Sequence, residues 1–276
     1  MIAVLIVGIA AALSLTMAGA WAIAIHPGRS GWTDAIWSFA LGGAGVVVAL
    51  APIQPGDGLT TRQIIVALLA AIWSVRLGLH IARRTTGGRD DPRYAKLREE
   101  WGIDFRRQLF LFLQIQAAAA FFLVLSVMIA AHNPTPGLRA GDWLGIILLA
   151  AAIIGEGVAD AQLARFRADP THTNGICDVG LWGVSRHPNY FFQWLGWLAY
   201  AVIAIDPNGS YAWGWIALSG PAFMYWLLVH VSGIPPLESH MLHSRGDAFR
   251  AYQAQVNAFW PGPRRAQVSG QQSVGP

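Results

Sequence analysis

Long apolar segments recur along this chain of 276 residues, and they constrain its fold more than any other feature. An α-helix needs about 20 residues to cross the hydrocarbon core of a bilayer. Only 12% of the residues are charged, whereas soluble domains carry roughly 25%. The sequence therefore predicts an all-α, multi-pass integral membrane protein. We expect about seven transmembrane helices, at residues 2–25, 33–52, 63–83, 109–131, 143–163, 190–205 and 211–231.

The remaining segments are polar or amphipathic. Residues 94–101 could form a short surface helix, and 237–259 suits an amphipathic helix on the membrane surface. Residues 264–276 are rich in Gln, Ser and Gly, which is typical of disorder. We therefore expect one transmembrane domain over residues 1–262, a disordered tail over 263–276 and no soluble domain.

Basic residues indicate the orientation of the chain. Of its 19 Lys and Arg residues, most lie in three segments, 83–107, 165–186 and the tail after 231. Cytoplasmic loops carry an excess of Lys and Arg. This rule places these segments and the C-terminus in the cytoplasm and the N-terminus outside. The net charge of +4 thus reports topology and does not indicate a nucleic-acid partner.

The stretch 180–197 joins a polar loop to the sixth apolar segment. Pro188 suits the first turn of a helix, where its missing N–H is not needed. Ser185, Arg186 and His187 stand just before that turn, and the free N–H groups of a first helical turn favour an anion. We interpret this stretch as a helix entrance that could hold a phosphate-bearing ligand. The alternative is an Arg–His pair that only snorkels to the membrane surface.

Two acidic residues lie inside the fifth apolar segment. Glu156 and Asp160 are four residues apart and share one face of a helix. Charges inside a span usually face a cavity or a partner. Together with Arg167, Arg186 and His187, they could bind the ribose hydroxyls and phosphates of a nucleotide. The alternative is a set of ion pairs that ties helices together.

Several familiar motifs are absent from the sequence. No Gly-x-Gly-x-x-Gly or Walker motif occurs, so no soluble nucleotide-binding fold is expected. No pattern of metal ligands is convincing, and we predict no metal site. The single cysteine, Cys177, excludes an intramolecular disulfide, and we interpret it as structural.

These residues resemble the DUF1295 branch of the steroid 5-alpha-reductase-like membrane proteins. The resemblance covers roughly residues 60–262 and rests on a combination of short motifs rather than on any one of them. The motifs are Gly180-Leu-Trp, Ser185-Arg-His-Pro-Asn-Tyr190, Glu156-x-x-x-Asp160-x-Gln162 followed by Arg167, Gly233-Ile-Pro-Pro-Leu-Glu238, and Arg245-Gly with Tyr252. Asp90-Asp-Pro-Arg-Tyr94 fits the same family.

The resemblance implies an NADPH-dependent reductase with a seven-helix membrane fold. Its substrate would be a lipid, steroid-like or other, with a C=C bond conjugated to a carbonyl. A cytoplasmic cofactor points to a bacterial inner membrane, and the resemblance leaves the oligomeric state open. The cofactor-binding residues that it implies are Asp160, Arg167, Arg186 and Asn189, and we add Glu156, His187, Tyr190, Gln193 and Glu238 to this set.

The chain departs from the family pattern at two places. Phe192 and Gln193 stand where the family usually has Gly-Glu. Steroid reductases use a Tyr in an early span, but residues 63–83 contain none, and Trp73 lies near that place. No catalytic residue is therefore assigned.

Two other functions fit parts of the pattern. Isoprenylcysteine carboxyl methyltransferases, which use S-adenosylmethionine, share an Arg-His-Pro-x-Tyr element and a similar tail. Asn189 and the set of Glu156, Asp160 and Gln162 favour the reductase. The third possibility is a non-catalytic, lipid-binding membrane subunit.

Overall fold

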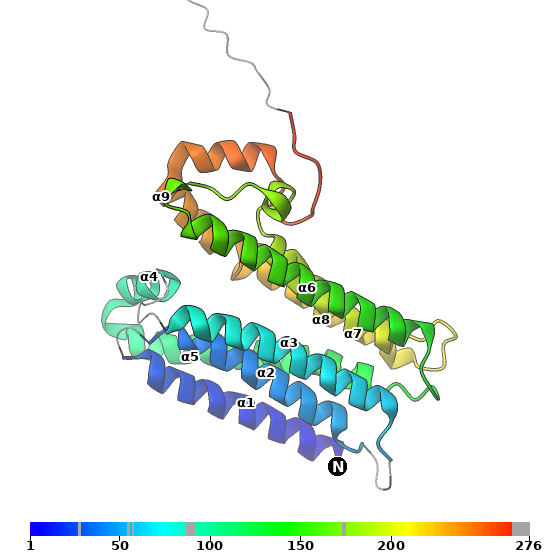
Figure 1. The fold of residues 1–276 in the computed structure, drawn as a ribbon. Coiled ribbons are helices and arrows are strands. Elements are labelled where there is room, and N and C mark those ends of the chain that lie inside the picture. The colour runs from blue at the N-terminus through cyan, green and yellow to red at the C-terminus, as the bar shows by residue number, and fades with distance from the viewer. Residues whose placement is uncertain (27–28, 54–55, 57, 87–91, 173–174, 267–276) are drawn as a thin grey trace, which may run out of the picture. The chain divides into compact units, whose positions relative to one another are not determined.

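The computed structural model describes residues 1–26, 29–53, 56, 58–86, 92–172 and 175–266 (Figure 1). Its long elements are all α-helices, as predicted. They are α1 (Ile2–Ala24), α2 (Trp32–Leu50), α3 (Thr61–Thr85), α4 (Pro92–Trp101), α5 (Phe105–Ala131), α6 (Ala140–Ala168), α7 (Pro188–Ala204), α8 (Ser219–Trp226) and α9 (Ile234–Gln255). The shorter helical turns are η1 (Gly102–Asp104), η2 (Pro170–His172), η3 (Gly180–Gly183), η4 (Ala212–Leu218) and a π-helical turn, η5 (Leu227–Val231).

Six helical stretches of the described residues are long and apolar enough to cross a membrane, which confirms the multi-pass prediction. They contain α1, α2, α3, α5, α6 and the stretch from η4 to α9. The expected span at 190–205 is α7, whose 17 residues are near the minimum of about 17 for a crossing. The predicted orientation of the chain stays a prediction.

The expected span at 211–231 falls within the long apolar helical stretch Ala212–Gln255, which confirms it as a candidate crossing. The structure divides this span into η4, α8 and η5. Pro221 explains part of this division, because it has no N–H to donate to the carbonyl four residues earlier. Helix α9 follows Gly233 and has prolines at its first positions, where a missing N–H is tolerated.

The chain divides into two compact units. Unit 1 contains Met1–Leu149 and Trp197–Phe223, and unit 2 contains Ala150–Gly196 and Met224–Pro276. The single domain expected over residues 1–262 stays a prediction. The described part of the expected tail is limited to residues 263–266, and residues 267–276 lie outside the described residues, as do Asp90 and Asp91 of the charged loop motif.

In unit 1, α1, α2, α3 and α5 pack side by side (Figure 1). Helix α3 begins with a capping box, because the Thr60 hydroxyl accepts a hydrogen bond from the Gln63 N–H and the Gln63 side chain accepts one from the Thr60 N–H. Gly42 allows α2 to approach α3 closely, since a Cβ there would lie 2.0 Å from the Cβ of Ser74. A small residue at this position therefore lets the two helices pack closely.

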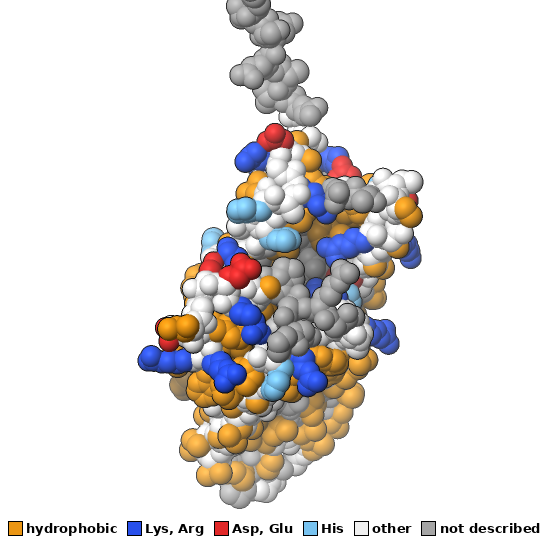
Figure 2. Space-filling view, turned by 90° about the vertical axis from the view of Figure 1, so that its left-hand side faces the viewer, with side chains coloured by type: hydrophobic (Ala, Val, Ile, Leu, Met, Phe, Trp, Pro, Cys, Tyr) orange, Lys and Arg blue, Asp and Glu red, His pale blue; other side chains and the backbone are white. Residues whose placement is uncertain are grey.

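Large apolar side chains remain exposed on the transmembrane helices. Val4, Leu15, Ile115 and Ile147 are each more than 60% exposed. Figure 2 shows a broad area of hydrophobic side chains in which no charged side chain is visible. Such an area would be costly in water, and in a membrane protein it faces lipid tails.

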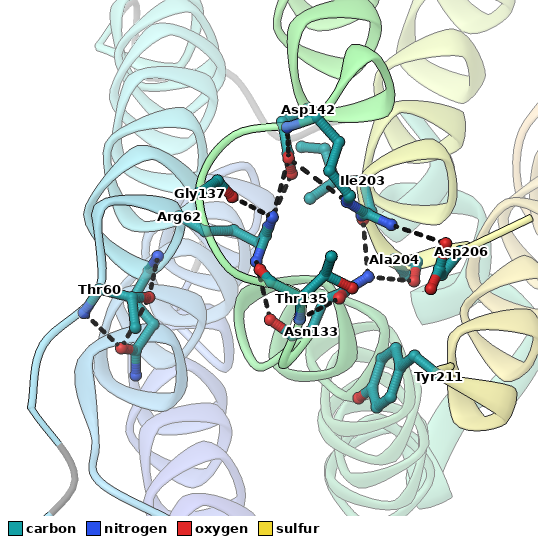
Figure 3. Close-up of polar contacts among 12 residues, drawn as sticks. Thr60, Arg62, Asn133, Thr135, Gly137, Asp142, Ile203, Ala204, Asp206 and Tyr211 are labelled. Atoms are coloured by element: carbon teal, nitrogen blue, oxygen red, sulfur yellow. Dashed lines mark hydrogen bonds and ion pairs between the residues drawn. The ribbon is translucent and has the colours of Figure 1, made fainter. Parts of the chain in front are cut away.

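One end of unit 1 contains a buried network of charges (Figure 3). Arg62, on α3, forms two hydrogen bonds with the carboxylate of Asp142, on α6, at 2.8 and 2.9 Å. Its other three N–H groups donate to the carbonyl oxygens of Asn133, Thr135 and Gly137 at 2.6–2.8 Å. Arg62 is 4% exposed and Asp142 is 1% exposed. All five N–H donors of this buried guanidinium are therefore satisfied within the protein.

A second Arg–Asp pair extends the network. Arg139 lies 3.6 Å from Asp142 and 3.7 Å from Asp206, and it donates to the carbonyl oxygens of Ile203 and Ile205. The two arginines and two aspartates balance in charge. The network joins the start of α3, the loop between α5 and α6, the start of α6 and the end of α7. It thus fixes one end of the helix bundle.

Candidate functional site

Every residue predicted to bind the cofactor lies in unit 2. The acidic residues Glu156 and Asp160 and the basic Arg167 are on α6. Arg186 and His187 precede α7, and α9 carries Glu238. The first turns of α7 carry Asn189, Tyr190 and Gln193, and Pro188 begins this helix as predicted.

Helix α6 holds the loop that leads into α7. The side chain of Gln162 accepts a hydrogen bond from the Leu181 N–H at 3.0 Å. The Trp182 indole N–H donates to the carbonyl of Ala159 at 2.9 Å. Gly180 has a φ of +59°, and a Cβ there would lie 2.5 Å from the Gln162 side chain. Only glycine adopts this backbone conformation readily, so Gly180 allows the loop to contact α6.

The segment after α9 binds the same loop from its other side. The Arg186 N–H donates to the Asn257 carbonyl at 2.8 Å, and the Gly262 N–H donates to the Val184 carbonyl at 2.9 Å. The Ser185 hydroxyl donates to the carbonyl of Phe259 at 2.9 Å. The loop therefore has a defined position, which the chain after residue 255 helps to set.

Glu238 is the centre of a cluster of polar side chains. Its carboxylate accepts hydrogen bonds from Arg186 Nε at 2.7 Å, from His187 Nε2 at 3.0 Å and from Gln253 at 2.8 Å. Arg186 also donates from Nη1 to the carbonyl oxygens of Gln253 and Val256, and from Nη2 to Glu238 at 3.2 Å. Arg186, His187 and Glu238 have side chains that are 10%, 4% and 14% exposed.

The charge state of this cluster follows from its contacts. Burial alone would raise the pKa of Glu238, but the hydrogen bonds from His187 and Arg186 and the charge of Arg186 outweigh it and lower the pKa to about 2. With α9 on the membrane surface, as predicted for residues 237–259, Glu238 lies outside the membrane-spanning segments. Burial also lowers the pKa of His187, although its hydrogen bond to Glu238 opposes this shift. A neutral histidine beside an ionised glutamate is thus the stable pair at neutral pH.

The remaining predicted residues differ in exposure. Glu156 and Gln193 are buried, at 5% and 8% exposure. Asn189 and Tyr190 are partly buried, and the Tyr190 ring stacks on His187 with centroids 5.5 Å apart. Asp160 is also partly buried and Arg167 is exposed near the end of α6. Among the nine predicted residues, Arg186, His187 and Glu238 form one hydrogen-bonded cluster.

A surface hollow of about 260 Å³ also lies in unit 2. Its lining includes Ile176, Asp178, Tyr252 and Gln255. None of the nine predicted residues lines it. Within the described part of the chain, no group of three or more His, Cys, Asp and Glu residues is placed to hold a metal ion.

The chain matches a protein family over residues 20–256, a range that contains all of these residues. The family is described as a protein of unknown function, DUF1295. The chain belongs to the DUF1295 family. The resemblance inferred from the Arg186-His187-Pro188 region and its companion motifs is thereby confirmed at the level of the family.

A relative of this DUF1295 protein is known from Schizosaccharomyces pombe, where it is an uncharacterized protein. The two are 24% identical over 231 residues, which are 72% of this chain and 63% of the relative. The chain thus spans less than two thirds of the length of the relative. No solved structure matches the chain.

One member of the Glu238 cluster was missed from the sequence. Gln253 donates to Glu238, but a single Gln on an amphipathic helix carries no signal of its own. Its position one residue after Tyr252, which belongs to the family motif, was the available clue. The sequence indicates Ser185 only as a neighbour of Arg186, whereas its hydroxyl connects the loop to the segment after α9.

Proposed function

We propose that this DUF1295 protein is a membrane-embedded, NADPH-dependent reductase of a C=C bond conjugated to a carbonyl in a lipid substrate. The observation that carries the proposal is the buried cluster of Glu238, Arg186 and His187 in a chain of largely apolar helices. Buried ionisable groups are costly unless they are paired, and clusters of them with shifted pKa values often mark a functional site. The family resemblance supplies the reductase assignment.

The residues present suit a nicotinamide nucleotide. Asp160, a partly buried carboxylate, suits ribose hydroxyls, and the exposed guanidinium of Arg167 suits phosphates. The Nδ1 atom of His187 is buried and has no hydrogen-bond partner in the described part of the chain, so it can receive one from a ligand. Bound NADPH would supply the hydride for the reduction.

The side chains around the site would bind and orient the ligand. The loop of residues 180–187 is held on both sides, by Gln162 and by the segment after α9, so its polar groups are positioned before a ligand arrives. Gln193 is neutral where related proteins usually have Glu, and it offers both a donor and an acceptor. Its buried amide could therefore contact a neutral part of the ligand.

The proposal is tested by titrating the purified protein in detergent with NADPH, NADH and S-adenosylmethionine in parallel. We expect saturable binding of NADPH and consumption of NADPH when an enone lipid is added. Asp160→Ala and Asn189→Ala should weaken NADPH binding without lowering the thermal midpoint. The matched control is Arg250→Ala, which removes an exposed Arg–Asp pair on α9. Binding of S-adenosylmethionine alone would indicate methyl transfer, and binding of neither would favour a non-catalytic subunit.

A further inference from the structure

The hydrogen bond between His187 and Glu238 determines the tautomer of His187. Glu238 is ionised at neutral pH and can only accept hydrogen bonds, so the Nε2 atom of His187, 3.0 Å from it, must carry a hydrogen. The neutral ring then has a lone pair on Nδ1. This atom is buried, and no described residue donates a hydrogen bond to it. A carboxylate that holds one ring nitrogen while the other stays open is the arrangement by which proteins prepare a histidine to act on a ligand.

The open lone pair selects the kind of ligand atom that can approach it. Phosphate oxygens only accept hydrogen bonds at neutral pH, so they would repel Nδ1. Arg186 does not change this selection, because four of its N–H donors are already directed to Glu238 and to two backbone carbonyls. The entrance to α7 therefore favours an uncharged hydrogen-bond donor beside His187 rather than a phosphate.

We infer that His187 is a ligand-binding residue whose Nδ1 atom accepts a hydrogen bond from an uncharged donor, a ribose hydroxyl or the carboxamide N–H of a nicotinamide nucleotide. This inference rests on the proposed function and adds the role of one atom to it. Glu238 is then a positioning residue, because it holds the tautomer that leaves Nδ1 free to accept.

Two isosteric substitutions separate binding from structure. His187→Gln places an amide N–H where Nε2 was, so it keeps the contact with Glu238 and loses the acceptor at Nδ1. His187→Asn places an amide oxygen near the position of Nδ1 and loses the contact with Glu238. We expect His187→Gln to weaken NADPH binding about tenfold, the effect of losing a hydrogen bond of about 1.4 kcal/mol, with little change in the thermal midpoint. His187→Asn should bind more tightly than His187→Gln, although its thermal midpoint should be lower.

The ligand can be varied as well. The 3-acetylpyridine analogue of NADPH lacks the carboxamide N–H. If that N–H is the donor, wild type should bind the analogue as weakly as His187→Gln binds NADPH. An unchanged preference for NADPH over the analogue in His187→Gln would assign the donor to a ribose hydroxyl instead. If wild type binds NADPH and His187→Gln binds it equally well, the inference fails while the proposed function stands. If both variants lose affinity only in proportion to their thermal midpoints, His187 is structural and the inference fails. If wild type binds no NADPH, the proposed function itself fails.

Discussion

Replacing Arg62 by Met should remove a large part of the stability of unit 1. Arg62 makes five hydrogen bonds, two of them to Asp142, and both side chains are almost completely buried (Figure 3). Methionine has a similar length but no donors. The substitution leaves the Asp142 carboxylate buried, with Arg139 at 3.6 Å as its nearest remaining cation.

The size of the effect follows from the contacts that are lost. Breaking a buried ion pair by removing one partner costs about 3–5 kcal/mol, because the other charge stays buried without its counterpart. Three backbone carbonyls lose a donor as well, and a buried unsatisfied acceptor adds about 1–3 kcal/mol unless the loop relaxes. Since the loop between α5 and α6 can move, we expect a total loss of about 4 kcal/mol.

The measurement is the free energy of unfolding in mixed detergent micelles, followed by circular dichroism as denaturing detergent is added. The matched control is Arg250→Met, which breaks an Arg–Asp pair whose side chains are 66% and 96% exposed. Exposed pairs contribute about 0–1 kcal/mol. The control should therefore unfold almost as the wild type does. Arg62→Lys should recover only part of the loss, because an ammonium group cannot match the two-pronged contact with Asp142.

The double variant Arg62→Met with Asp142→Leu tests whether the pair acts as a unit. Removing both charges leaves no unpaired carboxylate, so the double variant should be more stable than the sum of the single losses predicts. We expect a coupling energy of about 2 kcal/mol or more. Two results would refute the argument that this network holds the helix ends together. One is a free energy of unfolding for Arg62→Met that equals that of Arg250→Met. The other is strict additivity of the two single losses in the double variant.

Acid should destabilise the protein in two steps. Burial lowers the pKa of His187 below 6.5, so on acidification the unfolded chain binds a proton at this residue before the folded chain does. The free energy of unfolding therefore falls as the pH falls below about 6.5. His187→Gln should abolish this step in a series of melting curves. Below pH 4.5, the ionised Glu238, with its pKa of about 2, should lose its stabilising contribution in the same way. Gly180→Ala should cost about 1–2 kcal/mol, measured by detergent unfolding, because its φ of +59° is unfavourable for alanine. Phe259→Ala should cost about 3–5 kcal/mol in the same assay, since Phe259 is 3% exposed, and Trp260→Ala, at 49% exposure, should cost less.

Most of the helices could be predicted because membrane-spanning segments are long and uniformly apolar. The expected segments 2–25, 33–52 and 63–83 correspond to α1, α2 and α3 with ends that differ by one or two residues. The span at 211–231 was found as well, but its division into η4, α8 and η5 was not predicted, since average hydropathy does not register the missing N–H of Pro221. A hydropathy pattern therefore finds spans better than it finds breaks within them.

The site was predictable where its residues are close together in the sequence. Arg186 and His187 were recognised beside Pro188, and α7 does begin there. Spacing alone does not connect Glu238 with this pair, because it lies 51 and 52 residues from His187 and Arg186. Residue spacing does not reveal hydrogen-bond partners, which the structure provides. Arg186 donates most of its N–H groups to other protein atoms, and His187 keeps one acceptor, Nδ1, without a donor among the described residues.

The Arg62 network had no signal in the sequence, and the reason is physical. Arg62 and Asp142 are 80 residues apart, and each stands at a helix end, where a charged residue is ordinary. The positive-inside rule treats Arg62 and Arg139 only as loop charges. The structure shows that each of them is paired with an aspartate. A charge that is neutralised by a buried partner is not equivalent to a solvated loop charge in the positive-inside rule. Arg93 and Arg186, in the segments predicted to be cytoplasmic, are also paired with carboxylates, so setting paired arginines aside removes residues from both sets of loops and the orientation stays a prediction.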